Sequence, residues 1–120
     1  MTNVLIADAQ PEVRLALRLL LLDIEMKVVG EAADWPMTLK TAANTQPDMV
    51  VIDWELISTH HLLDELRATC SDPVVIVLVG SLSSRQQSAF SVGADNFVSK
   101  HEAPDRFADR LKAAATKVQS

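Results

Sequence analysis

The stretch Asp-Met-Val-Val-Ile-Asp-Trp-Glu-Leu, residues 48–56, decides the fold. Val50, Val51 and Ile52 form an apolar run without alternation, which is typical of a strand covered on both faces in a parallel sheet. The run ends abruptly at Asp53. Because open α/β sheets bind ligands at the carboxyl ends of their strands, Asp53 is the first candidate for a functional residue.

The rest of the chain alternates strand-like and helix-like segments. We expect further strands over residues 4–7, 26–32, 74–79 and 96–99, and helices over about 11–23, 34–44, 58–69, 85–92 and 105–118. Prolines in first turns, the candidate N-caps Asp34, Ser58 and Thr59, and Gly93 after the fourth helix set these limits. Such alternation predicts right-handed crossovers and a parallel sheet with helices on both faces.

The first helix carries more apolar residues than one packing face requires. The residues expected to face the core are Val13, Ala16, Leu17, Leu20 and Leu21. Leu15, Leu19 and Leu22 widen this face. The simpler interpretation is a helix well buried against the sheet, and the alternative is a surface for a partner.

Length and composition limit the class of protein. The chain has 120 residues, of which 48% are apolar, and this is enough for the core of a single domain. Its net charge of -5 argues against nucleic-acid binding by this domain. One cysteine excludes an intramolecular disulfide, and no signal-peptide pattern or membrane-length apolar run occurs. We therefore expect a cytoplasmic domain without a membrane segment.

Charged residues follow three of the expected strands. Asp8 ends the first strand, Asp53 the third, and Lys100 the fifth. If the first and third strands are neighbours, both carboxylates meet at one edge of the sheet, together with the lysine. Two carboxylates favour a hard cation such as Mg²⁺, and a carboxylate can attack phosphorus while the lysine neutralises phosphoryl charge. The three residues therefore suit phosphoryl transfer onto Asp53.

Three motifs carry a resemblance to a known family. Leu5-Ile6-Ala7-Asp8, Val51-Ile52-Asp53 and the Gly-Ala-Asp-Asn-Phe-Val-Ser-Lys run at 93–100 resemble, in order and spacing, the receiver domain of bacterial two-component response regulators. The resemblance covers essentially the whole chain, so it implies a single receiver domain over residues 1–120. It also implies a flavodoxin-like α/β fold with a five-stranded parallel sheet in the order 2-1-3-4-5. Within the family, the chain looks most like the subfamily whose receivers often carry a helix-turn-helix output domain.

The resemblance assigns roles to particular residues. It implies that Asp53 accepts a phosphoryl group from a histidine kinase, so the chain is not itself expected to be an enzyme. Asp8, Asp53 and the main-chain carbonyl of Glu55 would hold Mg²⁺. Lys100 would contact the phosphoryl group, and Phe97 matches the aromatic switch position. Further expected partners are an output domain or downstream protein and, through the first helix, a second copy of the chain.

The chain departs from the family pattern at two positions of this site. Ala9 stands where the family has a second acidic residue, the usual direct metal ligand. Gly80 stands where the family has Ser or Thr, which leaves Ser81 as the candidate hydroxyl contact to the phosphoryl group. The lost carboxylate predicts weak Mg²⁺ binding and a direct ion pair between Lys100 and Asp53.

Two other functions remain open at this point. Ala9 and Gly80 would also suit a degenerate receiver, which works as a protein-interaction module without phosphorylation. A small flavodoxin-like enzyme or nucleotide binder is the third interpretation. The absence of a Gly-rich phosphate loop after the first strand counts against it.

Overall fold

The computed structural model describes residues 2–56, 61–69, 73–79 and 96–119. Its elements are β1 (Asn3–Ala7), α1 (Pro11–Asp23), β2 (Lys27–Ala32), α2 (Trp35–Thr45), β3 (Met49–Asp53), the short 3-10 helix η1 (Trp54–Leu56), α3 (His61–Thr69), β4 (Val74–Val79), β5 (Asn96–Ser99) and α5 (Pro104–Gln119). Every described strand and α-helix falls where the sequence predicts one of that type. The helix expected over 85–92, its stop at Gly93 and the caps Ser58 and Thr59 lie outside the described residues.

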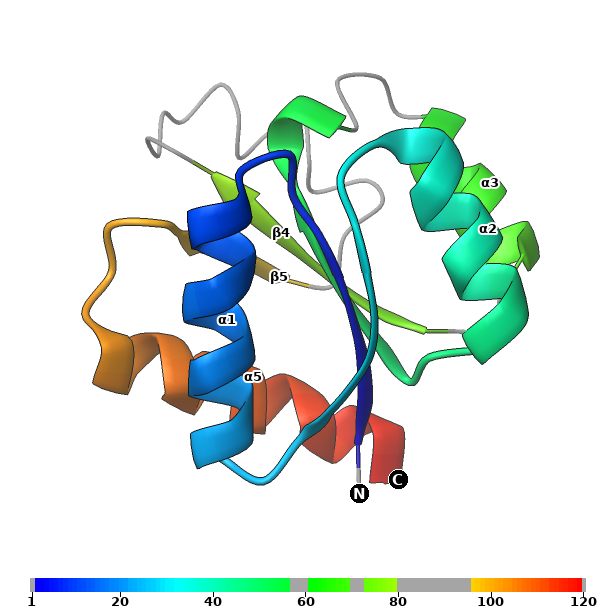
Figure 1. Ribbon diagram of the computed structural model, residues 1–120. Helices are drawn as coiled ribbons and strands as arrows, with labels where there is room; N and C mark the ends of the chain where they lie inside the picture. Colours follow the sequence, from blue (N-terminus) through cyan, green and yellow to red (C-terminus); the bar gives the residue numbers. More distant parts are fainter. Residues whose placement is uncertain (1, 57–60, 70–72, 80–95, 120) are drawn as a thin grey trace.

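All five strands form one parallel sheet in the order β2-β1-β3-β4-β5. The predicted flavodoxin-like order 2-1-3-4-5 is therefore confirmed. Helices α1 and α5 cover one face of the sheet, and α2 and α3 cover the other (Figure 1). The three central strands are buried along almost their whole length, as their continuous apolar runs predict.

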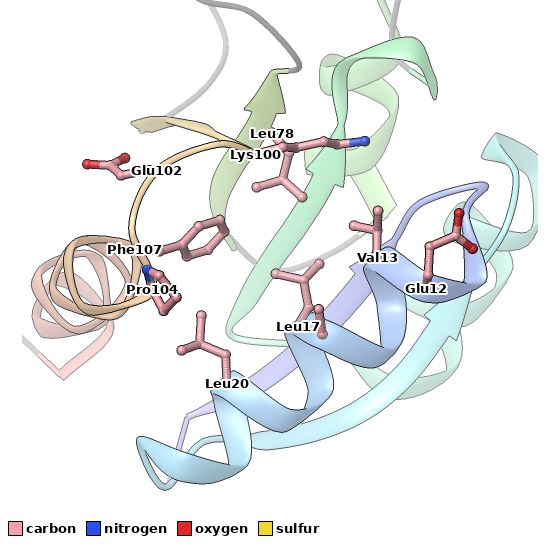
Figure 2. A pocket seen from close by; sticks show the side chains of 10 residues that line it. Glu12, Val13, Leu17, Leu20, Leu78, Lys100, Glu102, Pro104 and Phe107 are labelled. Atoms are coloured by element: carbon pink, nitrogen blue, oxygen red, sulfur yellow. The ribbon is translucent and has the colours of Figure 1, made fainter.

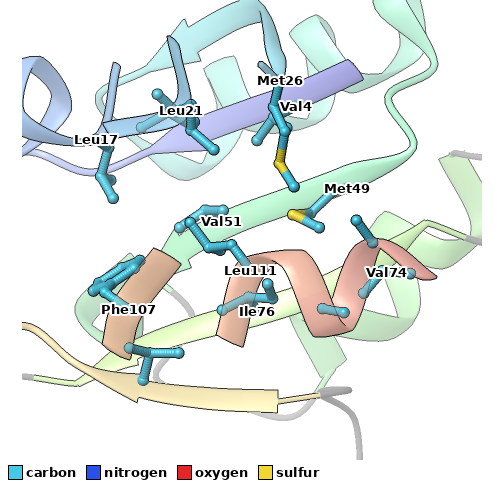
Figure 3. Close-up of a cluster of buried hydrophobic side chains, with 14 of the residues drawn as sticks. Val4, Leu17, Leu21, Met26, Met49, Val51, Val74, Ile76, Phe107 and Leu111 are labelled. Carbon is cyan, nitrogen blue, oxygen red and sulfur yellow. The ribbon is translucent and has the colours of Figure 1, made fainter. Parts of the chain in front are cut away.

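Successive strand residues point to opposite faces of the sheet, so the core consists of two apolar clusters. On the α1/α5 face, strand residues such as Val51 and Ile76 pack with Phe107 and Leu111 (Figure 3). On the α2/α3 face, strand residues such as Val50 and Ile52 pack with other buried side chains, among them Leu66 of α3. The sheet is thus held rigidly between two layers, and its carboxyl edge provides a fixed platform for side chains.

Local sequence signals explain where the helices begin. Pro11 opens α1, where its missing N–H costs nothing. Asp34 caps α2 by accepting a hydrogen bond from the Met37 N–H at 2.9 Å, as predicted. Gln46 ends that helix in the left-handed conformation, with φ of 45°.

The outer face of α1 corrects the simpler sequence interpretation. Leu17 and Leu21 are buried, but Leu15, Leu19 and Leu22 are 47%, 58% and 72% exposed. Ala16, expected to face the core, is also exposed. Of the other positions expected to face the core, Val13 and Leu20 pack against the cluster that contains Leu17 and Leu21, so the inward face is confirmed except at Ala16. Within the described residues, no helix is long and apolar enough to cross a membrane.

Candidate functional site

The parallel register of β1 and β3 brings two aspartates together. Ala7 pairs with Ile52, so the residues that follow them, Asp8 and Asp53, lie at neighbouring positions on the carboxyl edge of the sheet. Both are buried: Asp8 is 0% and Asp53 5% exposed. Their convergence was predicted on the condition that the first and third strands are adjacent, and the sheet order meets this condition.

The end of β5 brings a lysine to the same edge. Val79 of β4 pairs with Ser99 of β5. The ladder then continues by one residue, because the Lys100 N–H donates to the Val79 carbonyl at 2.9 Å. The stem of Lys100 passes the rim of an apolar pocket between α1 and the start of α5, while its amine points away from Phe107 (Figure 2).

The Lys100 amine bridges the two carboxylates. Its Nζ lies 3.0 Å from Asp8 Oδ2 and 3.1 Å from Asp53 Oδ1. The Oδ2 atom of Asp8 is buried, and among the described residues it has no hydrogen-bond partner apart from this charged contact with Lys100. Three residues from three strand ends therefore form one site, with two negative charges facing one positive charge.

Asp8 also organises the loop that leads into α1. Its Oδ1 accepts a hydrogen bond from the Gln10 N–H at 2.8 Å. Its own N–H donates to the Ala32 carbonyl at 3.0 Å, which ties the end of β1 to β2. One carboxylate oxygen thus holds the loop, and the other faces Lys100 and the site.

Burial and the neighbouring charges shift the pKa values of both Asp53 and Lys100. Burial raises the pKa of Asp53 above its ordinary value, and the charges of Asp8 and Glu55 raise it further, against the opposing effect of Lys100. Burial alone would lower the pKa of Lys100, but its contacts with Asp8 and Asp53 outweigh this effect and the pKa is raised. The lysine is therefore firmly charged, while ionisation of Asp53 is opposed by its surroundings.

Three other positions singled out in the sequence, Phe97, Glu55 and Ala9, lie near this edge of the sheet. Phe97 is half-buried on β5 and packs against the α2/α3 cluster. Glu55 lies in η1, and its side chain is exposed next to the site. Ala9, which stands where receiver domains usually have a second acidic residue, is exposed at the edge of the sheet. Gly80 and Ser81 lie outside the described residues, so the expected phosphoryl contact of Ser81 stays a prediction.

Arg14 is a site residue that the sequence reasoning missed. Its Nη1 donates to the main-chain carbonyl of Asp8 at 2.7 Å, and its Nε lies 3.5 Å from Glu31 Oε1 on β2. The guanidinium thereby fixes the backbone at Asp8 from the first turns of α1. The sequence does place Arg14 on the first helix, six residues after Asp8. Its acceptor is a main-chain carbonyl, however, and residue types do not reveal such a contact.

The donors at this edge fit a hard cation. Carboxylate and carbonyl oxygens are the ligands that Mg²⁺ takes, and it commonly uses one or two protein carboxylates and keeps several waters. Asp8 offers a buried oxygen without a hydrogen bond, and Asp53 lies beside it. Within the part of the chain that is described, no three acidic, histidine or cysteine side chains converge as a metal cluster. The side chains therefore suit an ion held loosely, with water completing its coordination.

The fold and the site together define a class of protein: a flavodoxin-like domain whose buried strand-end aspartate faces a second carboxylate and a lysine. Comparison with known families agrees with this class. The model of the response regulator receiver domain matches residues 4–112. The chain therefore belongs to the receiver domain family of two-component response regulators.

The curated relatives that the chain resembles include transcriptional regulatory proteins. The chain is 34% identical over 116 residues to the transcriptional regulatory protein KdpE of Mycobacterium tuberculosis, covering 95% of this chain and 51% of the relative. The KDP operon transcriptional regulatory protein KdpE of Escherichia coli is 31% identical over 116 residues, with the same two coverages. The chain thus spans about half the length of these curated relatives.

Solved structures share the fold at lower sequence identity. The receiver domain of AraT from Geobacillus stearothermophilus superposes with a TM-score of 0.83 at 24% identity, covering 98% of this chain and 95% of that one. The isolated receiver domain of RcsB from Salmonella enterica serovar Typhimurium gives 0.82 at 24% identity, covering 97% and 88%. These similarities confirm the receiver fold over essentially the whole chain.

Proposed function

We propose that the chain is a signalling receiver that accepts a phosphoryl group on Asp53 from a phosphohistidine of a histidine kinase. The observation that carries the proposal is the pair of contacts from Lys100 Nζ to Asp8 Oδ2 and Asp53 Oδ1, at 3.0 and 3.1 Å. A structural ion pair would need only one carboxylate. Two buried carboxylates around one amine leave an excess negative charge, which is the arrangement that suits a cation and a transferred phosphoryl group.

Asp53 is the nucleophile in this proposal. A carboxylate oxygen forms a bond to phosphorus, and the bond from phosphorus to the histidine nitrogen breaks, with its electron pair staying on nitrogen. Lys100 already contacts Oδ1 of Asp53 at 3.1 Å, so its charge lies beside the nucleophile. As the acyl phosphate forms, the amine can follow the negative charge from the carboxylate to a phosphoryl oxygen.

The residues around Asp53 prepare this step. Asp8, Asp53 and the main-chain carbonyl of Glu55 are the groups that would hold Mg²⁺, which would neutralise phosphoryl oxygens when bound. Arg14 positions Asp8 through the main chain. With Ala9 in place of a third acid, we expect this cation to bind weakly and in competition with the Lys100 amine.

The remaining assignments follow from this role. The chain would be the substrate of a kinase and not an enzyme with its own turnover, and it would act in the cytoplasm as a single domain over residues 1–120. Phe97, half-buried beside β4, would move with the phosphorylated state and change the surface offered to a partner. The KdpE relatives are transcriptional regulators, so we propose a DNA-binding output domain or its equivalent as the downstream partner.

A small-molecule phosphodonor tests the proposal without knowledge of the kinase. The chain is incubated with acetyl phosphate or phosphoramidate at several Mg²⁺ concentrations, and intact mass is measured. We expect one phosphoryl adduct in the wild type that hydroxylamine removes, as an acyl phosphate requires. The adduct should be absent in Asp53→Asn and retained in Asp109→Asn, an exposed aspartate of α5.

Each other outcome contradicts the proposal. An adduct that persists in Asp53→Asn places the acceptor elsewhere. No adduct at any Mg²⁺ concentration, in protein that is folded by circular dichroism, assigns the chain to receivers that act through protein contact without phosphorylation.

A further inference from the structure

Glu31 of β2 lies outside the phosphoryl site but is connected to it through one side chain. Its Oε1 lies 3.5 Å from Arg14 Nε, and its Oε2 lies 3.1 Å from Arg18 Nη1, both on α1. Arg14 in turn donates from Nη1 to the main-chain carbonyl of Asp8 at 2.7 Å. Asp8 is the aspartate whose Oδ2 faces the Lys100 amine. A chain of contacts therefore leads from the edge strand of the sheet to the site.

An extra residue in β2 turns Glu31 toward α1. Val4 of β1 pairs with Val28, but the next residue, Leu5, pairs with Gly30, so β2 has one residue more than β1 over this stretch. Strict alternation would put residues 28 and 31 on opposite faces of the sheet. With the extra residue, Val28 packs against the α1/α5 cluster and Glu31 meets the arginines of α1 on the same face. Bulges of this kind redirect side chains and are frequent next to active sites.

The hydrogen bond from Arg14 to Asp8 depends on an arginine side chain that is already held in place. An arginine has several rotatable bonds, and their freedom opposes a single contact with a carbonyl oxygen. The planar guanidinium presents Nε to Glu31 and Nη1 to the Asp8 carbonyl at the same time. The side chains of Arg14 and Glu31 are 21% and 28% exposed, so water only partly screens their pairing. Glu31 thereby restricts Arg14 to the conformation that reaches Asp8.

The main chain at Asp8 determines where its carboxylate points. The Asp8 N–H donates to the Ala32 carbonyl at 3.0 Å, and its Oδ1 accepts from the Gln10 N–H at 2.8 Å. The contact with Arg14 holds the remaining group, the Asp8 carbonyl. Without that contact, the peptide group that follows Asp8 is free to rotate. The rotation would shift the Asp8 carboxylate relative to the Lys100 amine, which lies 3.0 Å from its Oδ2.

We propose that Glu31 is a positioning residue of the site, which acts through Arg14 on the main chain of Asp8. The consequence for phosphoryl transfer rests on the proposed function of Asp53 as the acceptor. Glu31 contacts the arginines and not the carboxylates of the site, so its loss leaves the reacting groups present but less well aimed. Small misplacements reduce a rate strongly, whereas a partly exposed ion pair contributes little to folding stability. Transfer rate and stability should therefore respond differently to its replacement.

Amide hydrogen exchange tests the positioning without any phosphoryl transfer. In Glu31→Gln, the N–H groups of Asp8 and Gln10 should exchange about threefold faster or more, because the loop that they hold opens more often. The N–H of Val51, in the buried strand β3, should keep its rate and so exclude a general loss of stability. Arg18→Ala is the matched control, because it removes the other arginine from Glu31 and leaves the Arg14 contact intact. Equal exchange at both loop amides in Glu31→Gln and wild type would overturn the proposal.

A double-variant cycle then tests whether Glu31 acts through Arg14. The rate constant of adduct formation is measured by intact mass with acetyl phosphate, at the Mg²⁺ concentration that gives the wild-type maximum. We expect Glu31→Gln to lower it about three- to tenfold and Arg14→Ala at least as much. The double variant should be no slower than Arg14→Ala, because Glu31 has no effect once Arg14 is gone. Effects that multiply in the double variant would assign Glu31 a different route to the site and overturn the proposal.

The two measurements separate this inference from the proposed function. If wild type forms no adduct while the Asp8 and Gln10 amides respond to Glu31→Gln, the acceptor role of Asp53 fails and the positioning of Asp8 stands. If wild type and Glu31→Gln form the adduct at the same rate, the proposed function stands and Glu31 is not a positioning residue. A lower urea midpoint for Glu31→Gln than for Arg18→Ala, with a faster Val51 amide, would make its role structural and would also overturn the proposal.

Discussion

At the level of single residues, the buried carboxylate of Asp53 lowers the stability of the folded domain when it is ionised. Asp53 is 5% exposed, and burial is the largest influence that raises its pKa above the ordinary value. Folding therefore favours its protonated form relative to the unfolded chain. Below the ordinary pKa of an aspartate, the folded state bears no cost from this group. As pH rises through the folded pKa, the carboxylate ionises and that relative stability is lost.

Replacement of this carboxylate should therefore stabilise the domain at neutral pH. We expect Asp53→Asn to unfold at a higher urea concentration than wild type at pH 7, because the amide has a similar shape and no charge to desolvate. The difference should shrink as pH falls below the ordinary pKa of aspartate, where wild type is also neutral at this position. Urea unfolding followed by circular dichroism at both pH values measures it.

The exposed Asp109→Asn serves as the control for this measurement, because it changes the net charge by the same amount on the surface of α5. A destabilised Asp53→Asn at pH 7 would mean that the contact with Lys100 outweighs the cost of burial. The electrostatic account of the site would then be wrong.

Ala9 gives a second prediction at this scale. Ala9→Asp adds a third carboxylate at the edge where Asp8 and Asp53 meet, so Mg²⁺ should bind about tenfold more tightly, equivalent to ~1.4 kcal/mol. The fluorescence of Trp54, which follows Asp53 directly, reports binding in a Trp35→Phe background. Ala9→Asn controls for size without charge. Equal Mg²⁺ affinity in the aspartate variant and wild type would contradict the view that the missing acid limits metal binding.

The sequence reasoning succeeded at residues whose position follows from strand ends. Asp8, Asp53 and Lys100 were predicted to converge because parallel strands finish at one edge, and their separations of 3.0 and 3.1 Å across the amine confirm it. Arg14 was missed because it acts on a carbonyl group, which every residue has. Side chains that recognise main-chain atoms cannot be found from residue types alone.

At the level of secondary-structure elements, Gly30 determines how closely α2 approaches the sheet. It lies in β2 opposite Leu5 of β1. A Cβ added at Gly30 would collide with Cγ2 of Thr41 on α2 and would contact Leu5 Cδ1 at 3.5 Å. No glycine in the described residues has a positive φ, so this glycine is required for space and not for backbone conformation.

Gly30→Ala should therefore destabilise the domain by about 1–3 kcal/mol, the usual cost of overpacking. Thr41→Ser removes Cγ2 and keeps the hydroxyl, so the double variant should recover most of the loss. Unfolding free energies of the two single variants and the double variant form a cycle that isolates the contact. If Thr41→Ser fails to relieve Gly30→Ala, the close approach of α2 is not the reason for glycine at this position.

The helix α1 shows what a pattern leaves undecided at this scale. The buried pair Leu17 and Leu21 and the exposed Leu15 and Leu19 are both spaced by four residues, so each pair forms a helical stripe. Periodicity predicted the helix with its observed ends, Pro11 and Asp23. It also assigned Leu17 and Leu21 to the inward face, where both are buried, but it could not tell that Leu15 and Leu19 stay exposed, because that depends on what packs around the helix. The strands posed no such difficulty, since continuous apolar runs are covered on both faces.

At the level of the whole molecule, the two apolar clusters lie on opposite faces of the sheet and share β1, β3 and β4. Alternate residues of one strand belong to different clusters: Val51 packs with α1 and α5, and Ile52 packs toward α2 and α3. If the helices on one face lose their packing, one side of β1, β3 and β4 is exposed, and the same strands support the cluster on the other face. We therefore expect the domain to unfold in one cooperative transition.

The positions of the two tryptophans allow this expectation to be tested. Trp35 and Trp54 both pack against the α2/α3 cluster, whereas Leu111 is fully buried in the α1/α5 cluster (Figure 3). Leu111→Ala should cost about 2–5 kcal/mol through the cavity it leaves. Tryptophan fluorescence, which reports the opposite face, should shift to lower urea concentration by as much as far-ultraviolet circular dichroism does. Arg106→Ala, an exposed position on the same helix, should shift neither signal. Fluorescence that keeps its wild-type midpoint while circular dichroism shifts would show that the two layers unfold independently, which a sheet shared between both clusters does not allow.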